Sequence, residues 1–212
     1  MDTLPKSNTE YGTKTYWEER YTREGSDHTF DWFKTYRDLL PIFEREVPDK
    51  SGRVLMLGAG NSTLSEDMYR DGYHHITNID FSETVIDQMR QRCADLTEME
   101  WEVMDIRELQ LADASFDLVV DKGTMDALMC EQGDVWDPSE ELMENVRREV
   151  DEALRVLKVG GKFIYITFGQ PHFRSRHLKR DAFHLEIHTI GDAFHYFVYI
   201  CTKINPQEST AQ

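Results

Sequence analysis

From Arg53 onward, short apolar runs alternate with segments whose apolar residues recur every three or four positions. A short apolar run is typical of a parallel strand covered on both faces, and the longer spacing is typical of a helix with one buried face. The alternation predicts a doubly wound α/β sheet with helices on both faces and right-handed connections. We predict strands over 54–57, 75–79, 99–104, 116–120 and 163–168.

The last two apolar segments, 182–190 and 194–202, are joined differently. Only Gly191-Asp192-Ala193 lies between them. A parallel pair of strands needs a long crossover, whereas an antiparallel hairpin needs only a few residues. We therefore expect a hairpin that adds an antiparallel edge to the sheet.

Capping residues predict where several helices begin. Thr63 and Glu66 have the spacing of a capping box, in which each side chain bonds the backbone N–H of the other residue. Ser82 can cap the helix after the second strand, and Asp31 can cap a helix in the aromatic N-terminal segment. A long helix is expected to begin near Asp137.

Gly160-Gly161 is expected to end that long helix, because glycine is common just past a helix C-terminus. The acidic stretch 131–152 covers much of it. Such a stretch is usually a solvated helix face, although it can also meet a basic partner.

The overall charge restricts the partners of the protein. The chain has 212 residues, which suits a single domain, and its formal net charge is -16. A surface this acidic repels phosphate backbones and attracts basic proteins, so we expect a basic protein partner and no nucleic acid. The alternative is that the charge only maintains solubility.

Other features favour a cytoplasmic protein with no metal. No apolar run is long enough to cross a bilayer, and no basic-then-apolar leader begins the chain, so we expect no membrane association. The three cysteines form no CxxC pair, which favours reduced thiols over disulfides or a zinc site. The histidines His184, His188 and His195 match no standard zinc spacing.

The loop Gly58-Ala59-Gly60-Asn61 follows the first predicted strand and precedes a helix. Glycines let a ligand approach the backbone, and the helix offers unpaired N–H groups to an anion. A dinucleotide fingerprint needs a third glycine where this chain has Thr63. A smaller anion, such as an amino-acid carboxylate, fits better; the alternative is a tight turn that simply requires glycine.

Carboxylates stand at the ends of the next three strands. Asp80 lies about twenty residues past the glycines, where a carboxylate can accept both ribose hydroxyls, and Phe81 can lie against a base. Asp105 can accept a hydrogen bond from an adenine amino group, and Asp121 ends the fourth strand. Each aspartate alone is more often a cap or a turn former, but together they indicate a nucleoside with an amino-acid tail, the anatomy of S-adenosylmethionine.

Seven stretches resemble one enzyme family over nearly the whole chain. The chain is similar to the class I S-adenosylmethionine-dependent methyltransferases, and within them to the group that includes the lysine methyltransferases of translation elongation factor 1-alpha. The stretches are YWEERY at 16–21, FDWF at 30–33, LGAGNSTLSEDMY at 57–69, NIDFS at 78–82, WEVMDIREL at 101–109, FDLVVDKGTMDAL at 116–128 and PHFRSRH at 171–177.

The resemblance implies a Rossmann-like, mostly parallel seven-strand sheet whose last strand is antiparallel. It also implies that S-adenosylmethionine is the cofactor and elongation factor 1-alpha, or a similar basic protein, the substrate. The implied cofactor contacts are Trp17, Tyr21, Trp32, Gly58, Asp80, Phe81, Asp105, Ile106 and Lys122. The loop residues Ala59, Gly60 and Asn61, together with Asp121, complete the predicted cofactor site.

Two positions depart from the general class I pattern. Leu57 stands where many relatives have an acidic residue, and Asn61 stands where many have a further glycine. Asn reaches positive φ more easily than most residues, so we expect the turn to survive at Asn61.

We divide the chain into a tail over 1–10, N-terminal helices over 11–50, a methyltransferase domain over 51–204 and a tail over 205–212. Trp17, Tyr21 and Trp32 are expected to form a lid over the cofactor. The alternative is that these aromatic side chains only pack the N-terminal helices on the sheet.

The sequence says less about the residues that receive the methyl acceptor than about those that hold the cofactor. We expect Asp121 and Asp126 to dock the substrate amine, apolar walls to drive its deprotonation, and His172 and Phe173 to shape the entrance. The bland alternative for the last two is a basic surface loop. A small-molecule methyltransferase and a non-catalytic scaffold remain rival functions, because the fold does not determine the acceptor. An open acidic rim beside Asp121 would favour a protein substrate.

Overall fold

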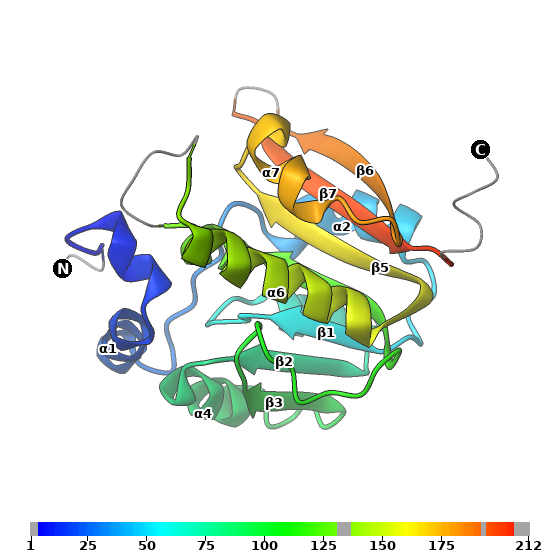
Figure 1. Ribbon diagram of the computed structural model, residues 1–212. Helices are drawn as coiled ribbons and strands as arrows, with labels where there is room; N and C mark the ends of the chain where they lie inside the picture. Colours follow the sequence, from blue (N-terminus) through cyan, green and yellow to red (C-terminus); the bar gives the residue numbers. More distant parts are fainter. Residues whose placement is uncertain (1–3, 131–136, 192–193, 206–212) are drawn as a thin grey trace.

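The computed structural model describes residues 4–130, 137–191 and 194–205. Their strands form one seven-stranded sheet in the order β3-β2-β1-β4-β5-β7-β6 (Figure 1). All neighbouring strands are parallel except that β7 runs antiparallel to both β5 and β6, which confirms the predicted sheet and hairpin. The strands are β1 (Val54–Leu57), β2 (Ile76–Asp80), β3 (Met99–Val103), β4 (Phe116–Lys122), β5 (Leu157–Thr167), β6 (Phe183–Ile190) and β7 (Tyr196–Lys203).

Helices cover both faces of the sheet. Figure 1 shows α6 crossing one face and α2 behind the other. None of the helices in the described ranges is long and apolar enough to cross a membrane. The helices are α1 (Lys14–Glu24), α2 (Tyr36–Glu46), α3 (Leu64–Arg70), α4 (Glu83–Arg92), α5 (Thr124–Leu128), α6 (Glu140–Val156) and α7 (Pro171–Leu178), preceded by the 3-10 helix η1 (Asn8–Gly12).

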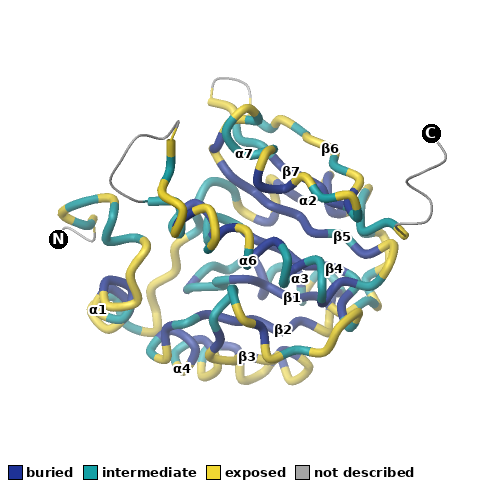
Figure 2. The backbone as a smooth tube through the Cα atoms, viewed as in Figure 1, coloured by how far each residue is buried: buried dark blue, intermediate teal, exposed yellow. Residues whose placement is uncertain are grey.

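The two faces have separate hydrophobic cores. In β1, Val54 and Met56 pack into the core shared with α1 to α4, whereas Leu55 and Leu57 pack into the core shared with α6. All four side chains are buried, as a central strand covered on both faces requires (Figure 2). The apolar run that predicted β1 is therefore explained by its two cores.

The long helix ends earlier than predicted. Strand β5 begins at Leu157, directly after α6, and Gly160-Gly161 lies inside this strand. The pairing of β4 with β5 shifts register between Phe116 and Leu118, and Gly160 has a φ of 82°. These glycines therefore serve an irregularity in the strand and do not end the helix.

One predicted cap is confirmed and two are wrong. The Ser82 hydroxyl accepts the Val85 N–H at 3.3 Å. Thr63 makes no side-chain capping bond, and its hydroxyl bonds Asp31 instead. Asp31 caps no helix either, because α2 begins later and is capped by Thr35.

Part of the predicted N-terminal tail is ordered. Residues 8–10 belong to η1, whose cap is the Ser7 side chain. Residues 1–3 and 206–212 of the two predicted tails lie outside the described residues.

Replacing Phe163, which is fully buried in β5, should lower stability strongly. Phe163→Ala removes a large side chain from a close-packed core, so the free energy of unfolding should fall by about 3–5 kcal/mol in denaturant titrations. The matched control is Val159→Ala on the same strand, where the side chain is exposed, and it should cost less than about 1 kcal/mol. If both variants lost the same free energy of unfolding, Phe163 would not be a core residue.

Candidate active site

A cavity of about 280 Å³ opens at the carboxyl ends of the parallel strands. This edge is where ligands of doubly wound sheets bind. Every predicted cofactor-binding residue except Asp121 lines the cavity; the set is Trp17, Tyr21, Trp32, Gly58, Ala59, Gly60, Asn61, Asp80, Phe81, Asp105, Ile106 and Lys122. Residues from the N-terminal segment and from four strand ends thus converge on one space.

Two constraints require glycine at Gly58 and Gly60 in the loop after β1. Gly58 and Gly60 have φ values of 55° and 53°, in the left-handed region that favours glycine. A Cβ atom on Gly58 would also lie 2.2 Å from the Thr124 hydroxyl, and one on Gly60 would lie 2.9 Å from the Tyr21 hydroxyl. Turn geometry and close packing both require glycine here, and the loop still lines the cavity.

Asn61 does not use the left-handed conformation that asparagine tolerates. Among the described residues other than glycine, only Phe33 and Ala114 have positive φ. The Asn61 amide instead donates to Glu24 Oε2 and to the His28 carbonyl, each at 3.2 Å. This residue therefore ties the glycine loop to the N-terminal segment.

Asp80 links the first two strand ends. Its carboxylate accepts the Gly60 N–H at 3.0 Å and the Ser82 N–H at 2.9 Å. The side chain is almost fully buried, and burial raises the pKa of Asp80 to about 6. A carboxylate held this rigidly at the cavity wall can accept hydroxyl groups from a ligand.

Asp105 already has a partner in the protein. Arg107 Nη2 lies 2.7 Å from Asp105 Oδ2. Burial alone would raise the pKa of Asp105, but hydrogen bonds from Arg107 outweigh it and hold this pKa below its usual value. Arg107 also lines the cavity, so a ligand amino group would share Asp105 with it.

The predicted lid residues both line the cavity and pack on one another. The Trp17 and Tyr21 rings stack with centroids 5.5 Å apart. The Arg20 guanidinium lies 5.3 Å from the Trp17 ring centroid and 5.9 Å from that of Trp32. The two alternatives for these aromatic side chains are thus compatible, and closure over a ligand remains a prediction.

Lys122 holds the N-terminal segment against the sheet. Its ammonium lies 2.9 Å from Asp31 Oδ1 and donates to the Trp32 carbonyl at 3.0 Å. Asp31 also accepts from the Ser62 and Thr63 hydroxyls at the start of α3. Burial lowers the pKa of Lys122, although the Asp31 charge opposes that shift.

Asp121 was predicted to contact the cofactor and to dock the amine, but it does not line the cavity. Asp121 is fully buried and accepts the Thr124 and Met125 N–H groups at the start of α5. Glu149 is also fully buried, and burial together with the Asp121 charge raises the pKa of Glu149 well above its usual value. Asp121 therefore faces the interior, and Glu149 is an exception to the solvated acidic face expected for α6.

Asp126 lines the cavity, but its charge is compensated. Oδ1 accepts from the Thr167 hydroxyl at 2.6 Å and forms an ion pair with Arg174 at 3.0 Å, while Oδ2 accepts from the Tyr165 hydroxyl at 2.9 Å. The carboxylate is buried, so this network provides its solvation. Asp126 thus offers no free negative charge to an incoming ammonium.

The expected entrance residues lie elsewhere. His172 and Phe173 are on α7 with ring centroids 4.0 Å apart, and neither is among the described residues that line the cavity. Phe33 and Phe168 line it instead. The sequence marks Phe33 within FDWF and Phe168 at the end of a predicted strand, but nothing local indicates that they meet.

Within the described part of the chain, no group of three or more His, Cys, Asp or Glu side chains is arranged to hold a metal ion. The chemistry of the cavity therefore has to be argued from its glycines, carboxylates and aromatic side chains.

A family model described as a methyltransferase domain matches residues 48–199. The chain belongs to this methyltransferase family. It is 34% identical over 202 residues to the EEF1A lysine methyltransferase 4 of Mus musculus, covering 94% of this chain and 79% of that one. It is also 34% identical to the eEF1A lysine and N-terminal methyltransferase of Bos taurus, covering 100% of this chain and 31% of the longer relative.

A solved structure supports the fold. The 1,6-didemethyltoxoflavin-N1-methyltransferase of Burkholderia thailandensis, determined with bound S-adenosylhomocysteine, aligns over 97% of this methyltransferase with a TM-score of 0.60. The alignment covers 94% of that chain, and the two sequences are 14% identical. The similarity therefore establishes the fold alone.

Breaking the Lys122–Asp31 ion pair should destabilise the methyltransferase. Both side chains are largely buried, so Lys122→Met leaves a buried carboxylate with fewer partners, and the free energy of unfolding should fall by about 3 kcal/mol. Chemical denaturation measures the loss. The control is Lys158→Met, which removes a half-exposed pair with Asp117 and should cost about 1 kcal/mol or less. A loss no greater than the control's would show that the ion pair does not hold the segment.

Proposed function

We propose that this methyltransferase takes its methyl group from S-adenosylmethionine and transfers it to a lysine side chain of translation elongation factor 1-alpha or a similar basic protein. The observation that carries the proposal is the similarity over nearly the whole chain to two relatives whose names both specify an eEF1A lysine. The similarity includes the N-terminal segment, which lies outside the matched domain model.

The described cavity suits the cofactor. Asp80, Phe81 and Ile106 line the cavity. In the proposed complex Asp80 would accept hydrogen bonds from the ribose hydroxyls, and Phe81 and Ile106 would provide apolar surface for the base. The glycine loop brings bare backbone to the amino-acid end. The bound cofactor supplies an electrophilic methyl group, and the protein's task is to align the acceptor and exclude water.

The charge of the protein supports a basic partner. A net charge of -16 favours encounter with a positively charged protein and disfavours nucleic acid. Asp121 itself is buried, so this residue adds no exposed charge to the expected acidic rim. The cavity nevertheless reaches the surface, since its lining residue Phe168 is 51% exposed. We place the protein in the cytoplasm, where it would meet a translation factor.

A transfer assay tests the substrate. Purified protein, radiolabelled S-adenosylmethionine and purified elongation factor 1-alpha should give labelled protein, and acid hydrolysis should release the label as methyllysine. Asp80→Ala is the control and should remove most of the label, because it removes the proposed ribose acceptor and the bond from the Gly60 N–H. The same reaction is also run with a cytosolic extract. If only small molecules of the extract are labelled, the substrate is a metabolite and not the elongation factor.

Cofactor affinity should rise with pH. The pKa of Asp80 is about 6 and its ionised form is the better acceptor, so affinity should be low below pH 6 and high above it. The dissociation constant of S-adenosylhomocysteine, measured by calorimetry, should fall by about ten-fold from about pH 5 to about pH 7.

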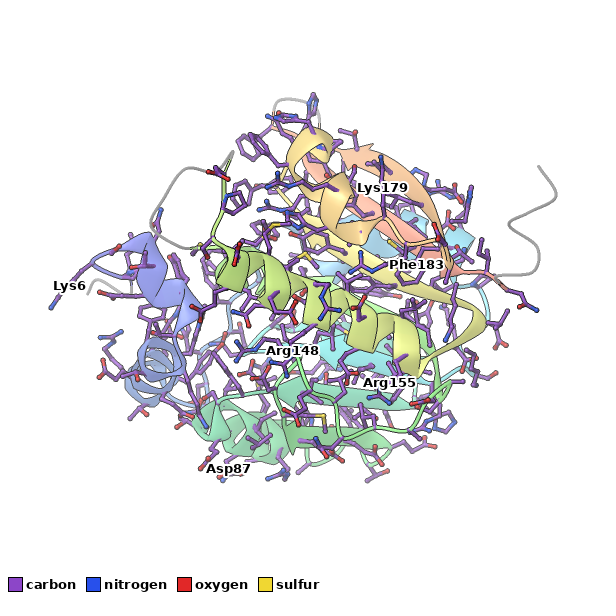
Figure 3. All side chains as sticks on the ribbon, viewed as in Figure 1. Lys6, Asp87, Arg148, Arg155, Lys179 and Phe183 are labelled. Atoms are coloured by element: carbon purple, nitrogen blue, oxygen red, sulfur yellow. The ribbon has the colours of Figure 1, made fainter. Side chains whose placement is uncertain are left out.

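Two variants identify the titrating group. Asp80→Asn should bind more weakly and lose this pH dependence. Asp87→Asn changes an aspartate on the outside of α4 (Figure 3) and should keep it. A pH profile that survives in Asp80→Asn would assign the dependence to another group.

A further inference from the structure

We propose that the acceptor lysine enters the cavity through an aromatic mouth formed by Phe33, Phe168 and Tyr196. This inference rests on the proposed function and specifies how the substrate side chain is received. None of these three residues was a predicted site residue.

The aromatic mouth lies at the acceptor end of the cavity. Asp105 and Ile106 line the cavity just past β3, whereas Phe168 lines it just past β5. Strands β2, β1 and β4 lie between β3 and β5 in the sheet. If the nucleoside occupies the end near Asp105, the opposite end near Phe168 is left for the acceptor.

The three rings form a connected surface. The Phe33 ring centroid lies 5.6 Å from that of Phe168 and 5.8 Å from that of Tyr196. Phe33 has a φ of 63°, which is unusual for a bulky residue, and it packs where Gly123 has no side chain. A Cβ atom on Gly123 would come within 3.1 Å of the Phe33 ring. The backbone at both residues is thus shaped to place the Phe33 ring here.

Aromatic rings suit both parts of a lysine side chain. Ring faces attract ammonium groups, and the methylene stem packs on apolar surface. The Lys34 ammonium already lies 5.0 Å from the Tyr196 ring centroid. An ammonium against a ring of the aromatic mouth therefore has a precedent within the protein.

The surroundings also favour the neutral amine that must attack the methyl group. Asp126, which lines the cavity and accepts from Thr167 next to Phe168, is paired with Arg174, and Asp121 is buried. Free carboxylates would stabilise the ammonium form, whereas desolvation between aromatic walls favours proton loss. The aromatic mouth can thus attract the cation at its outer side and promote its deprotonation inside.

The test separates acceptor binding from cofactor binding. Phe168→Ala should raise the KM for elongation factor 1-alpha by about ten-fold and leave the dissociation constant of S-adenosylhomocysteine unchanged. Phe168→Leu keeps apolar volume without a ring, so its KM should lie between those of the wild-type protein and Phe168→Ala. Phe168 is half-exposed, so both variants should fold, which thermal unfolding checks. The matched control, Val159→Ala, removes an exposed apolar side chain toward the other end of β5 and should leave KM unchanged.

A second readout does not depend on the protein substrate. Ligand-observed NMR measures the binding of Nα-acetyl-lysine methylamide to protein saturated with S-adenosylhomocysteine, with the norleucine analogue as the uncharged comparison. Binding of the lysine probe that Phe168→Ala abolishes supports the aromatic mouth, even if elongation factor 1-alpha proves not to be a substrate. An unchanged KM in Phe168→Ala, or no preference of the wild-type protein for the lysine probe, overturns the aromatic mouth and leaves the proposed function intact.

Discussion

The buried ion pair between Lys122 and Asp31 is the contact on which the site depends. It joins the end of β4 to the N-terminal segment, and Asp31 in turn holds the start of α3 through Ser62 and Thr63. The N-terminal segment supplies aromatic walls to the cavity, and this ion pair holds it there together with the Asn61 bonds to Glu24 and His28. A charged pair removed from water is costly unless it is well hydrogen-bonded, and this one has donors and acceptors on both sides.

Three consecutive residues at the end of β4 perform different tasks. Asp121 caps α5 from the interior, Lys122 holds the N-terminal segment, and Gly123 leaves room for Phe33. Successive side chains of a strand point to opposite faces, so neighbours in sequence serve different layers of the fold. The same alternation explains why Lys122 lines the cavity and Asp121 does not.

The electrostatics of the protein differ between its surface and its cavity. The chain as a whole is strongly acidic. Around the cavity, however, Asp126 is paired with Arg174, Asp31 with Lys122, and Asp105 with Arg107. Long-range attraction can thus bring a basic protein to the surface, while the pairing of Asp126 with Arg174 reduces the negative charge that would oppose deprotonation of a lysine in the cavity. Arg155, labelled on α6 in Figure 3, shows the same compensation on the outer face, where it pairs with Glu152 and Asp113.

The sequence by itself determined the sheet, its hairpin and the cavity residues of the glycine loop and of the strand ends at Asp80 and Asp105. These features depend on local information: apolar periodicity, glycine at a turn, and the residue that follows each strand. Only the tertiary structure decided the roles of Asp121, Asp126 and Phe168. Lys122 and Asp31 are 91 residues apart, and Asp126 and Arg174 are 48 apart, so no local pattern records that they pair. Whether a carboxylate is free, capping or neutralised depends on which distant side chain lies beside it, and that follows from packing alone.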